Sequence, residues 1–77
     1  MIVVTVRMYG NLRRFLPDGQ ASALMELPQG ATAETLLKAL KADQEVWLLA
    51  VNGVVADRTT PLKSGDLVEC YEPVAGG

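Results

Sequence analysis

The last two residues of the sequence, Gly76 and Gly77, are the first candidates for chemistry. The α-carboxylate of Gly77 is a group that can be activated by adenylation and then transferred to a nucleophile. Glycine has no Cβ, so a Gly-Gly segment is thin and bends freely, and it can enter a channel that a side chain would block. Chain ends are often frayed, so the pattern is informative only if a compact domain precedes it and directs it outward.

Other residue types restrict the chemistry further. The sequence has no His, which excludes Ser-His-Asp and Cys-His catalytic arrangements and a His-based metal site. It also lacks the glycine patterns typical of phosphate or dinucleotide binding. The single Cys70 could be interpreted as a sulfur-accepting thiol, but it shares strand parity with Val68, which favours a small, buried core residue. We therefore expect no metal site, no bound cofactor and no independent enzymatic activity.

Length and composition predict one globular domain. The chain has 77 residues, of which 49% are hydrophobic and 21% are charged. A net charge of −2 argues against nucleic acid as a partner, because phosphate contacts need a basic patch. No apolar run is long enough to span a membrane, no secretion signal is recognisable, and a lone cysteine suits a reducing compartment. We therefore expect a cytoplasmic protein without a membrane or nucleic-acid partner.

The first half of the chain predicts two strands and a helix. Side chains alternate in character over Ile2–Met8 and again over Ala21–Leu27, and the two strands are close enough in sequence to pair antiparallel. Between them, Asn11 is expected to cap a short helical turn. Thr32 is the expected N-cap of a helix of about ten residues. Its core-facing stripe, at i, i+3, i+4 and i+7, is formed by Ala33, Leu36, Leu37 and Leu40.

The second half predicts three further strands. The apolar run Val46–Val51 indicates a buried strand with Trp47 in the core, followed by an Asn52-Gly53 hairpin turn and a short returning strand, 54–56. A polar loop then leads to a last strand, Leu67–Tyr71. We expect this strand and the first one to lie side by side and parallel in the centre of the sheet. Pro73 cannot donate to a strand ladder, so the tail should leave the sheet there.

Five segments of the sequence resemble the MoaD/ThiS family of ubiquitin-like sulfur carrier proteins, and together they span the whole chain. They are Tyr9-Gly10-Asn11-Leu12-Arg13-Arg14-Phe15, Gly30-Ala31-Thr32, Leu49-Ala50-Val51-Asn52-Gly53, Pro61-Leu62-Lys63-Ser64-Gly65-Asp66 and Pro73-Val74-Ala75-Gly76-Gly77. The resemblance implies an α+β, ubiquitin-like β-grasp fold, with a mixed sheet of four to five strands and one main helix packed on one face. The β-grasp domain would cover residues 1–73, and residues 74–77 would form a flexible C-terminal Gly-Gly tail.

The resemblance also implies a function for the tail. In this family an E1-like adenylating enzyme uses ATP to activate the terminal glycine carboxylate. A sulfur donor such as a cysteine desulfurase or rhodanese then converts it to a thiocarboxylate, which donates sulfur in cofactor biosynthesis. These roles fall on Gly77, with Gly76 as the slender approach. The protein itself would be a carrier or a small synthase subunit, not an enzyme.

The long loop after the first strand makes the chain most similar to the small subunit of molybdopterin synthase, which implies a synthase large subunit as partner. The sequence departs from that subfamily at Cys70, where an aromatic residue is common, and at Glu72, where a second proline is common. The alternatives are a ubiquitin-like modifier conjugated through Gly77, or a carrier for thiamine, cysteine, tungsten cofactor or tRNA thiolation. A β-grasp binding module with an inactive tail is a further alternative.

A docking surface follows from strand alternation. Tyr9 and Tyr71 lie on the parity opposite to the core residues, and Val55 is expected to join them on the exposed face of the sheet. The family resemblance implies that these positions contact the partner, and tyrosine is enriched at interface anchors. We call Tyr9, Val55 and Tyr71 the docking patch. Beyond it, Pro73 and the tail residues Val74 and Ala75 are expected to contact the partner as the tail enters it.

Overall fold

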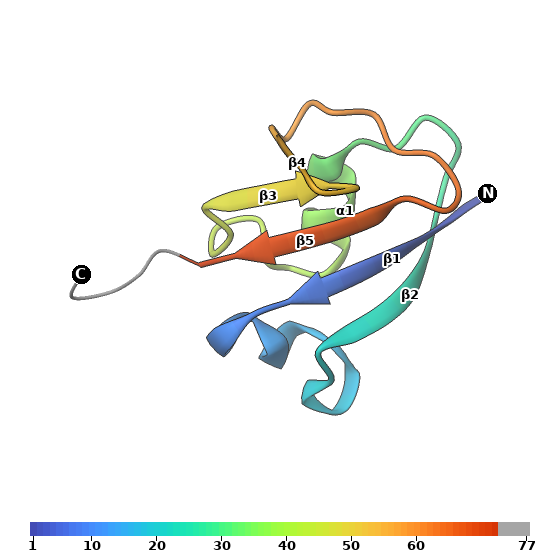
Figure 1. The fold of residues 1–77 in the computed structure, drawn as a ribbon. Coiled ribbons are helices and arrows are strands. Elements are labelled where there is room, and N and C mark those ends of the chain that lie inside the picture. The colour runs from blue at the N-terminus through green and yellow to red at the C-terminus, as the bar shows by residue number, and fades with distance from the viewer. Residues whose placement is uncertain (73–77) are drawn as a thin grey trace.

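The computed structural model describes residues 1–72, and Figure 1 shows a mixed sheet with one α-helix against one face. The five strands lie in the order β2-β1-β5-β3-β4. The elements are β1 Ile2–Met8, η1 Gly10–Phe15, η2 Pro17–Gly19, β2 Ser22–Leu27, α1 Ala33–Ala39, β3 Leu48–Val51, β4 Val54–Ala56 and β5 Leu67–Tyr71. The tail predictions for Pro73, Val74, Ala75, Gly76 and Gly77 lie outside the described residues.

The first and last strands form the centre of the sheet, as predicted. β1 pairs with β5 in parallel, with Val6 opposite Val68 and Met8 opposite Cys70. β2 is antiparallel to β1 on one side, and β3 is antiparallel to β5 on the other. β5, the strand that leads to the tail, therefore has a hydrogen-bonded neighbour on both sides.

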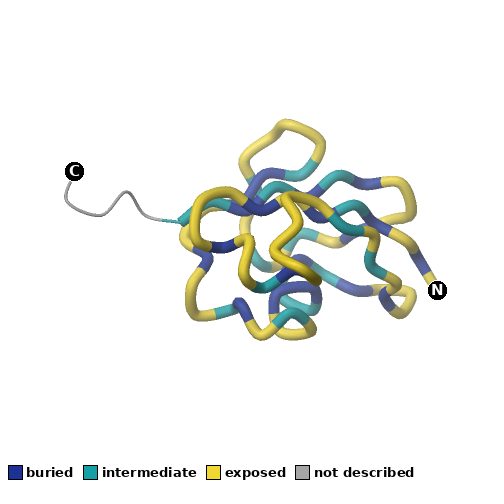
Figure 2. The backbone as a smooth tube through the Cα atoms, turned by 90° about the horizontal axis from the view of Figure 1, so that it is seen from below, coloured by how far each residue is buried: buried dark blue, intermediate teal, exposed yellow. Residues whose placement is uncertain are grey.

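The core lies between the sheet and α1. Inward-facing side chains of β1 and β5 pack against Leu36 and Leu37 of the helix, and these positions are fully buried. Figure 2 shows that the exposed positions gather in the loops at the periphery. Within residues 1–72, no helix is long and apolar enough to cross a membrane.

The prediction that Trp47 belongs to the core is wrong. Trp47 is 76% exposed and Leu48 is exposed as well, whereas Val46 and Leu49 on either side of them are buried. β3 begins only at Leu48. Trp47 therefore lies outside the strand. Leu48 pairs with Tyr71 on the face of the sheet that α1 does not cover, so an apolar run need not be buried throughout.

Helix α1 begins as predicted. The Thr32 hydroxyl accepts a hydrogen bond from the backbone N–H of Thr35 at 3.4 Å, and the Thr35 hydroxyl accepts one from the N–H of Thr32 at 3.1 Å. This reciprocal pair is a capping box. The helix has seven residues, fewer than the expected ten, because Lys41 adopts a left-handed conformation with φ 61° two residues after its end.

Candidate functional site

The candidate site is the end of the sheet at which the central strand β5 stops. We call Tyr71 and Glu72, the last two described residues, the tail root, because Pro73 and the predicted tail, residues 74–77, follow them in the sequence. Figure 1 shows the end of β5 at the same edge as the end of β1 and the start of β3. The N–H of Trp47, just before β3, donates to the carbonyl of Tyr71 at 3.1 Å. Backbone hydrogen bonding therefore continues to the last residue of β5.

Two residues of the docking patch are in direct contact. The rings of Tyr9 and Tyr71 are stacked, with centroids 4.8 Å apart and planes inclined by 2°. The hydroxyl of Tyr9 donates to Oε2 of Glu69, and Nη1 of Arg7 lies 3.9 Å from the same oxygen. The hydrogen bond to the Glu69 carboxylate raises the pKa of the Tyr9 hydroxyl above its ordinary value. The stacked pair thus has apolar ring faces and a fixed polar tip.

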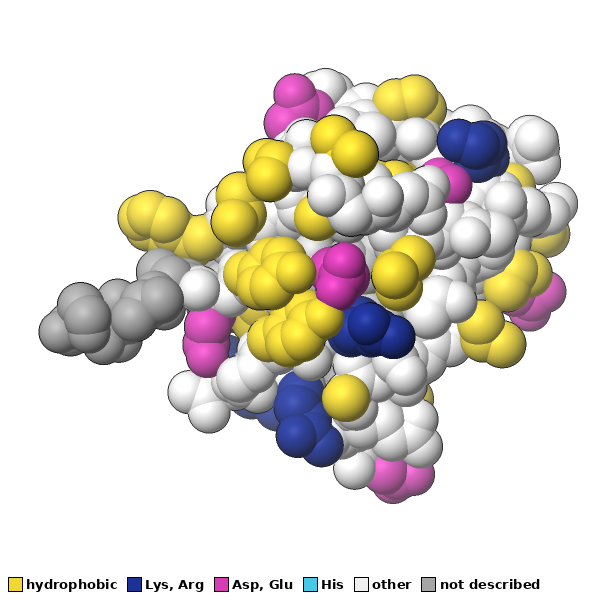
Figure 3. Space-filling view, viewed as in Figure 1, with side chains coloured by type: hydrophobic (Ala, Val, Ile, Leu, Met, Phe, Trp, Pro, Cys, Tyr) yellow, Lys and Arg dark blue, Asp and Glu magenta, His cyan; other side chains and the backbone are white. Residues whose placement is uncertain are grey.

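The third residue of the docking patch lies farther along the same face. Val55 on β4 is 68% exposed and pairs with Ala50, which in turn pairs with Glu69 on β5. Strand register therefore places Val55 and Glu69 on one face of the sheet. Figure 3 shows hydrophobic side chains gathered on the part of this face nearest to the end of β5. The structure brings Tyr9 and Tyr71 together and places Val55 two strands away from β5.

Sequence reasoning missed Leu48 as a member of this surface. Leu48 is exposed and pairs directly with Tyr71. It was assigned to the core because it belongs to a continuous apolar run. The signal that could have found it is the number of helices, since the only strong helical stripe in the sequence can cover one face of a sheet and leaves the other to solvent.

The predicted capping role of Asn11 is also wrong. The N-cap position of η1 is Tyr9, whose side chain makes no capping hydrogen bond, and Asn11 lies inside the helix. Instead, the backbone N–H of Asn11 donates to Oε1 of Glu72 at 2.9 Å. Gly10, which directly precedes Asn11, has a φ of 62°, and a Cβ at that position would overlap with the Glu72 carboxylate. The loop after β1 therefore contacts the tail root through its backbone.

Cys70 is buried, as predicted, and faces the core from β5. Burial raises the pKa of its thiol from 9.0 to about 12, because the thiolate would lose its hydration. The thiolate is the reactive form of cysteine, so this thiol is both uncharged and inaccessible near neutral pH. Among residues 1–72, no three or more His, Cys, Asp or Glu side chains are grouped as metal ligands would be.

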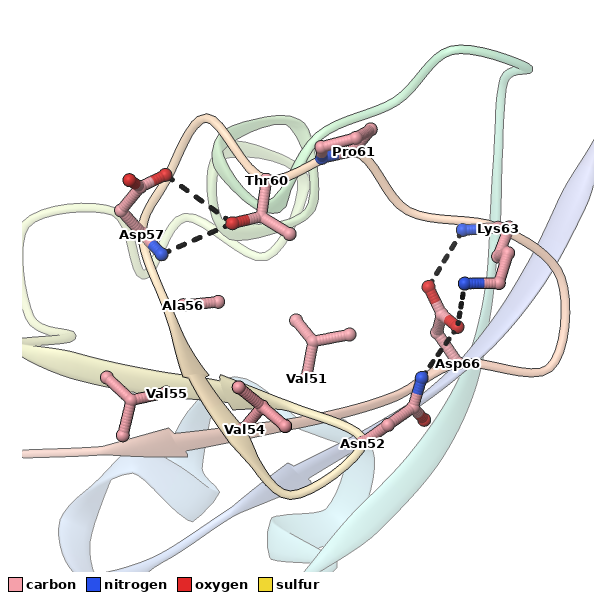
Figure 4. A pocket seen from close by; sticks show the side chains of 10 residues that line it. All are labelled: Val51, Asn52, Val54, Val55, Ala56, Asp57, Thr60, Pro61, Lys63 and Asp66. Atoms are coloured by element: carbon pink, nitrogen blue, oxygen red, sulfur yellow. Dashed lines mark hydrogen bonds and ion pairs between the residues drawn. The ribbon is translucent and has the colours of Figure 1, made fainter.

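A groove elsewhere on the molecule contains little of the predicted site. It lies between the β3–β4 hairpin and the following loop, and Figure 4 shows Val51, Val54 and Pro61 around it. At its end, the buried Asp66 carboxylate accepts hydrogen bonds from the Lys63 backbone and the Asn52 amide. Burial opposes ionisation of Asp66, but these hydrogen bonds outweigh it and lower its pKa. The groove borders the start of β5, whereas the tail root is at its end.

Comparisons with known proteins agree with this architecture. The structure is similar to a putative molybdopterin converting factor subunit 1 from Pyrococcus furiosus, with a TM-score of 0.79 and 27% identity over 96% of this chain and 100% of that one. A chain in the complex of subunits 1 and 2 of the molybdopterin-converting factor from Helicobacter pylori has a TM-score of 0.64 and 25% identity, over 99% and 100% of the two chains.

Small archaeal modifier protein 1 from Haloferax volcanii has a TM-score of 0.80 at 16% identity, over 96% of this chain and 100% of that one, which shows the fold alone. A search of curated protein sequences found no match. The sequence matches the ThiS family over residues 6–77, nearly its whole length. The fold is therefore the ubiquitin-like β-grasp, and the chain belongs to the ThiS family.

Proposed function

We propose that the protein is a sulfur carrier whose Gly77 carboxylate is adenylated and converted to a thiocarboxylate that donates sulfur in cofactor biosynthesis. The observation that carries this proposal is that the family match runs through residue 77, so that it includes Gly76 and Gly77. The fold supports it, because β5 ends at one end of the sheet, and the two glycines follow within a few residues.

The proposed chemistry requires little from the carrier besides its carboxylate. A carboxylate oxygen of Gly77 attacks the α-phosphorus of ATP on an E1-like enzyme, and pyrophosphate leaves. A sulfur nucleophile at the oxidation level of sulfide then attacks the carbonyl carbon, a C–S bond forms, and the C–O bond to AMP breaks. In the cell, a cysteine desulfurase or rhodanese would hold that sulfur as a cysteine persulfide, and two thiols oxidised to a disulfide would release it as sulfide. The buried Cys70 takes no part in either step.

We propose the large subunit of molybdopterin synthase as the partner that receives the sulfur. The likeness to the two molybdopterin converting factor proteins supports this choice over a carrier for thiamine, cysteine, tungsten cofactor or tRNA thiolation. In this proposal Tyr9, Val55 and Tyr71 contact the partner, and Pro73, Val74 and Ala75 follow the tail into it. In this proposal the partner supplies the site where the chemistry occurs, and the carrier supplies the Gly77 carboxylate.

The first prediction concerns the product of activation. Incubation with the cognate activating enzyme, ATP and sulfide should increase the intact mass by the difference between one sulfur and one oxygen, measured by mass spectrometry. Deletion of Gly77 is the matched control: it should abolish the mass change and leave the melting temperature unchanged, because the core is built from residues 2–70.

Two results would contradict the carrier proposal. One is an unchanged mass of the full-length protein when the same enzyme preparation converts another carrier. The other is an isopeptide bond between Gly77 and lysines of other proteins without any detectable thiocarboxylate in cells, which would support the ubiquitin-like modifier instead.

A further inference from the structure

We propose that Glu72 is a positioning residue: its carboxylate ties the tail root to the loop after β1 and so sets the direction in which the tail leaves the sheet. This inference rests on the proposed function, because the direction matters only if Gly77 must reach a partner's site. The structure shows the contact in the described part of the chain, directly before the tail.

The contact joins two distant parts of the sequence. Oε1 of Glu72 accepts a hydrogen bond from the backbone N–H of Asn11 at 2.9 Å, across 61 positions of sequence. An ionised acceptor makes such a bond shorter and stronger than one between neutral groups. Asn11 lies near the start of η1, which no side chain at its N-cap position caps. The Glu72 carboxylate therefore supplies to this helix the acceptor that a local cap usually supplies.

The loop is shaped to admit the carboxylate. Gly10 has a φ of 62°, a conformation that side-chain-bearing residues rarely adopt, and a Cβ there would overlap with Oε1 of Glu72. Among the glycines described, only Gly10 would place a Cβ within 4 Å of another residue; the others face open space. A side chain at position 10 would strain the turn and would displace the Glu72 carboxylate from its place beside the Asn11 N–H.

The tail root is held on its other side as well. The carbonyl of Tyr71 accepts the N–H of Trp47 from the β3 side, and the ring of Tyr71 stacks on Tyr9 from the β1 side. These contacts hold the residue before Glu72. Within residues 1–72, the side-chain contact of Glu72 with Asn11 is the hydrogen bond to the domain that lies farthest along the chain.

The consequence is a smaller volume for the tip to search. Five residues follow Glu72, and an extended chain spans at most about 3.6 Å per residue, so Gly77 stays within roughly 18 Å of the tail root. At that reach, rotation at the root displaces the tip by several ångströms. A root fixed before binding lowers the entropy lost when the tail enters its partner. Loss of the Glu72 contact should therefore weaken productive binding and leave the chemical step unchanged.

The test compares Glu72→Ala with Glu72→Gln, which keeps an oxygen acceptor, and with Glu26→Ala. Glu26 is exposed on β2 opposite Val3, near the end of the sheet away from the tail root, and its substitution removes the same charge. The readouts are kcat and KM of the carrier in adenylation by the cognate activating enzyme, melting temperature, and the amide exchange rate of Asn11 by NMR.

We expect Glu72→Ala to raise KM by about three- to tenfold with kcat unchanged, and to speed exchange of the Asn11 amide. Glu72→Gln should keep both KM and the exchange rate of the Asn11 amide close to the parent values, and Glu26→Ala should match the parent. The inference is overturned if Glu72→Ala leaves KM or Asn11 exchange unchanged, or if Gln and Ala behave alike. A parent protein that is active in this assay with an unaffected Glu72→Ala variant refutes only the positioning role; an inert parent with a competent enzyme refutes the proposed function, and the inference with it.

Discussion

At the scale of single residues, Cys70 shows how burial decides the role of a reactive group. It lies on the central strand β5, with Met8 of β1 and Leu49 of β3 on either side, and none of its surface is exposed. Under the proposed sulfur-carrier function, the terminal strand is a natural place to look for a sulfur-accepting thiol. Its pKa of about 12 and its position in the core argue for packing instead, since a nucleophilic cysteine needs both ionisation and access.

The second prediction is therefore that Cys70→Ala supports thiocarboxylation like the parent but is less stable by about 1–2 kcal/mol, owing to the cavity. The stability gap should depend on pH. Because the folded-state pKa is raised from 9.0 to about 12, the stabilisation from the buried thiol is fully present below pH 9 and is lost between pH 9 and pH 12. Urea denaturation of both proteins across this range measures the gap. A well-folded variant that no longer accepts sulfur would return Cys70 to the mechanism.

At the scale of elements, the start of α1 is held by its own cap and by a distant loop. Besides the capping box, the N–H groups of Ala33 and Glu34 donate to the carbonyls of Thr60 and Arg58. Arg58 also pairs with the Glu34 side chain at 3.1 Å. A helix of seven residues is too short to be stable alone, so these contacts and the packing of its apolar stripe maintain it.

The third prediction follows from the cap. Thr32→Ala should lower the free energy of unfolding by about 1 kcal/mol, because a helical N–H of the first turn loses its acceptor. Thr32→Ser keeps the hydroxyl and should stay close to the parent. Thermal or urea denaturation compares the three proteins, and equal stability of the two variants would show that the hydroxyl contributes nothing. Neither variant should change KM in the adenylation assay, since α1 lies on the covered face of the sheet.

At the scale of the whole molecule, the single helix leaves one face of the sheet open. On that face, beside the end of β5, lie the stacked Tyr9 and Tyr71 and the exposed Leu48, with Val55 farther along. A contiguous exposed apolar surface of this kind is typical of an interaction site. It adjoins the tail root, so a partner that covers it would also receive the tail.

The fourth prediction is that Tyr71→Ala weakens binding to the activating enzyme and to the synthase large subunit by about tenfold or more, as expected for a central aromatic anchor. Leu24→Ala is the control, because Leu24 is a 72% exposed side chain that pairs with Thr5 on β1, on the same face of the sheet but away from β5. Calorimetry gives the affinities and thermal melting checks folding. If folded Tyr71→Ala binds both partners as tightly as the parent, the docking patch is refuted.

The sequence by itself determined the elements whose signals are local. The alternation of β1, the capping residue Thr32 and the Asn52-Gly53 turn each depend on residues within a few positions of one another, and all three are present. Both turn residues have positive φ, 53° and 84°, as a tight hairpin requires. The parallel pairing of β1 with β5 was also predictable, because one helix and a short chain leave few other ways to bury a single apolar stripe.

Only the tertiary structure decided the features that depend on how many layers cover the sheet and on partners distant in sequence. Leu48 is apolar in an apolar run, yet it is exposed because it lies on the face of the sheet that α1 does not cover, and Trp47 is exposed just before the strand begins. Asn11 has the side chain of a cap, yet its backbone bonds Glu72, 61 positions away. A local sequence pattern shows the character of each side chain but not which residues lie opposite it in the fold. Those neighbours are set only when β1 and β5 come together.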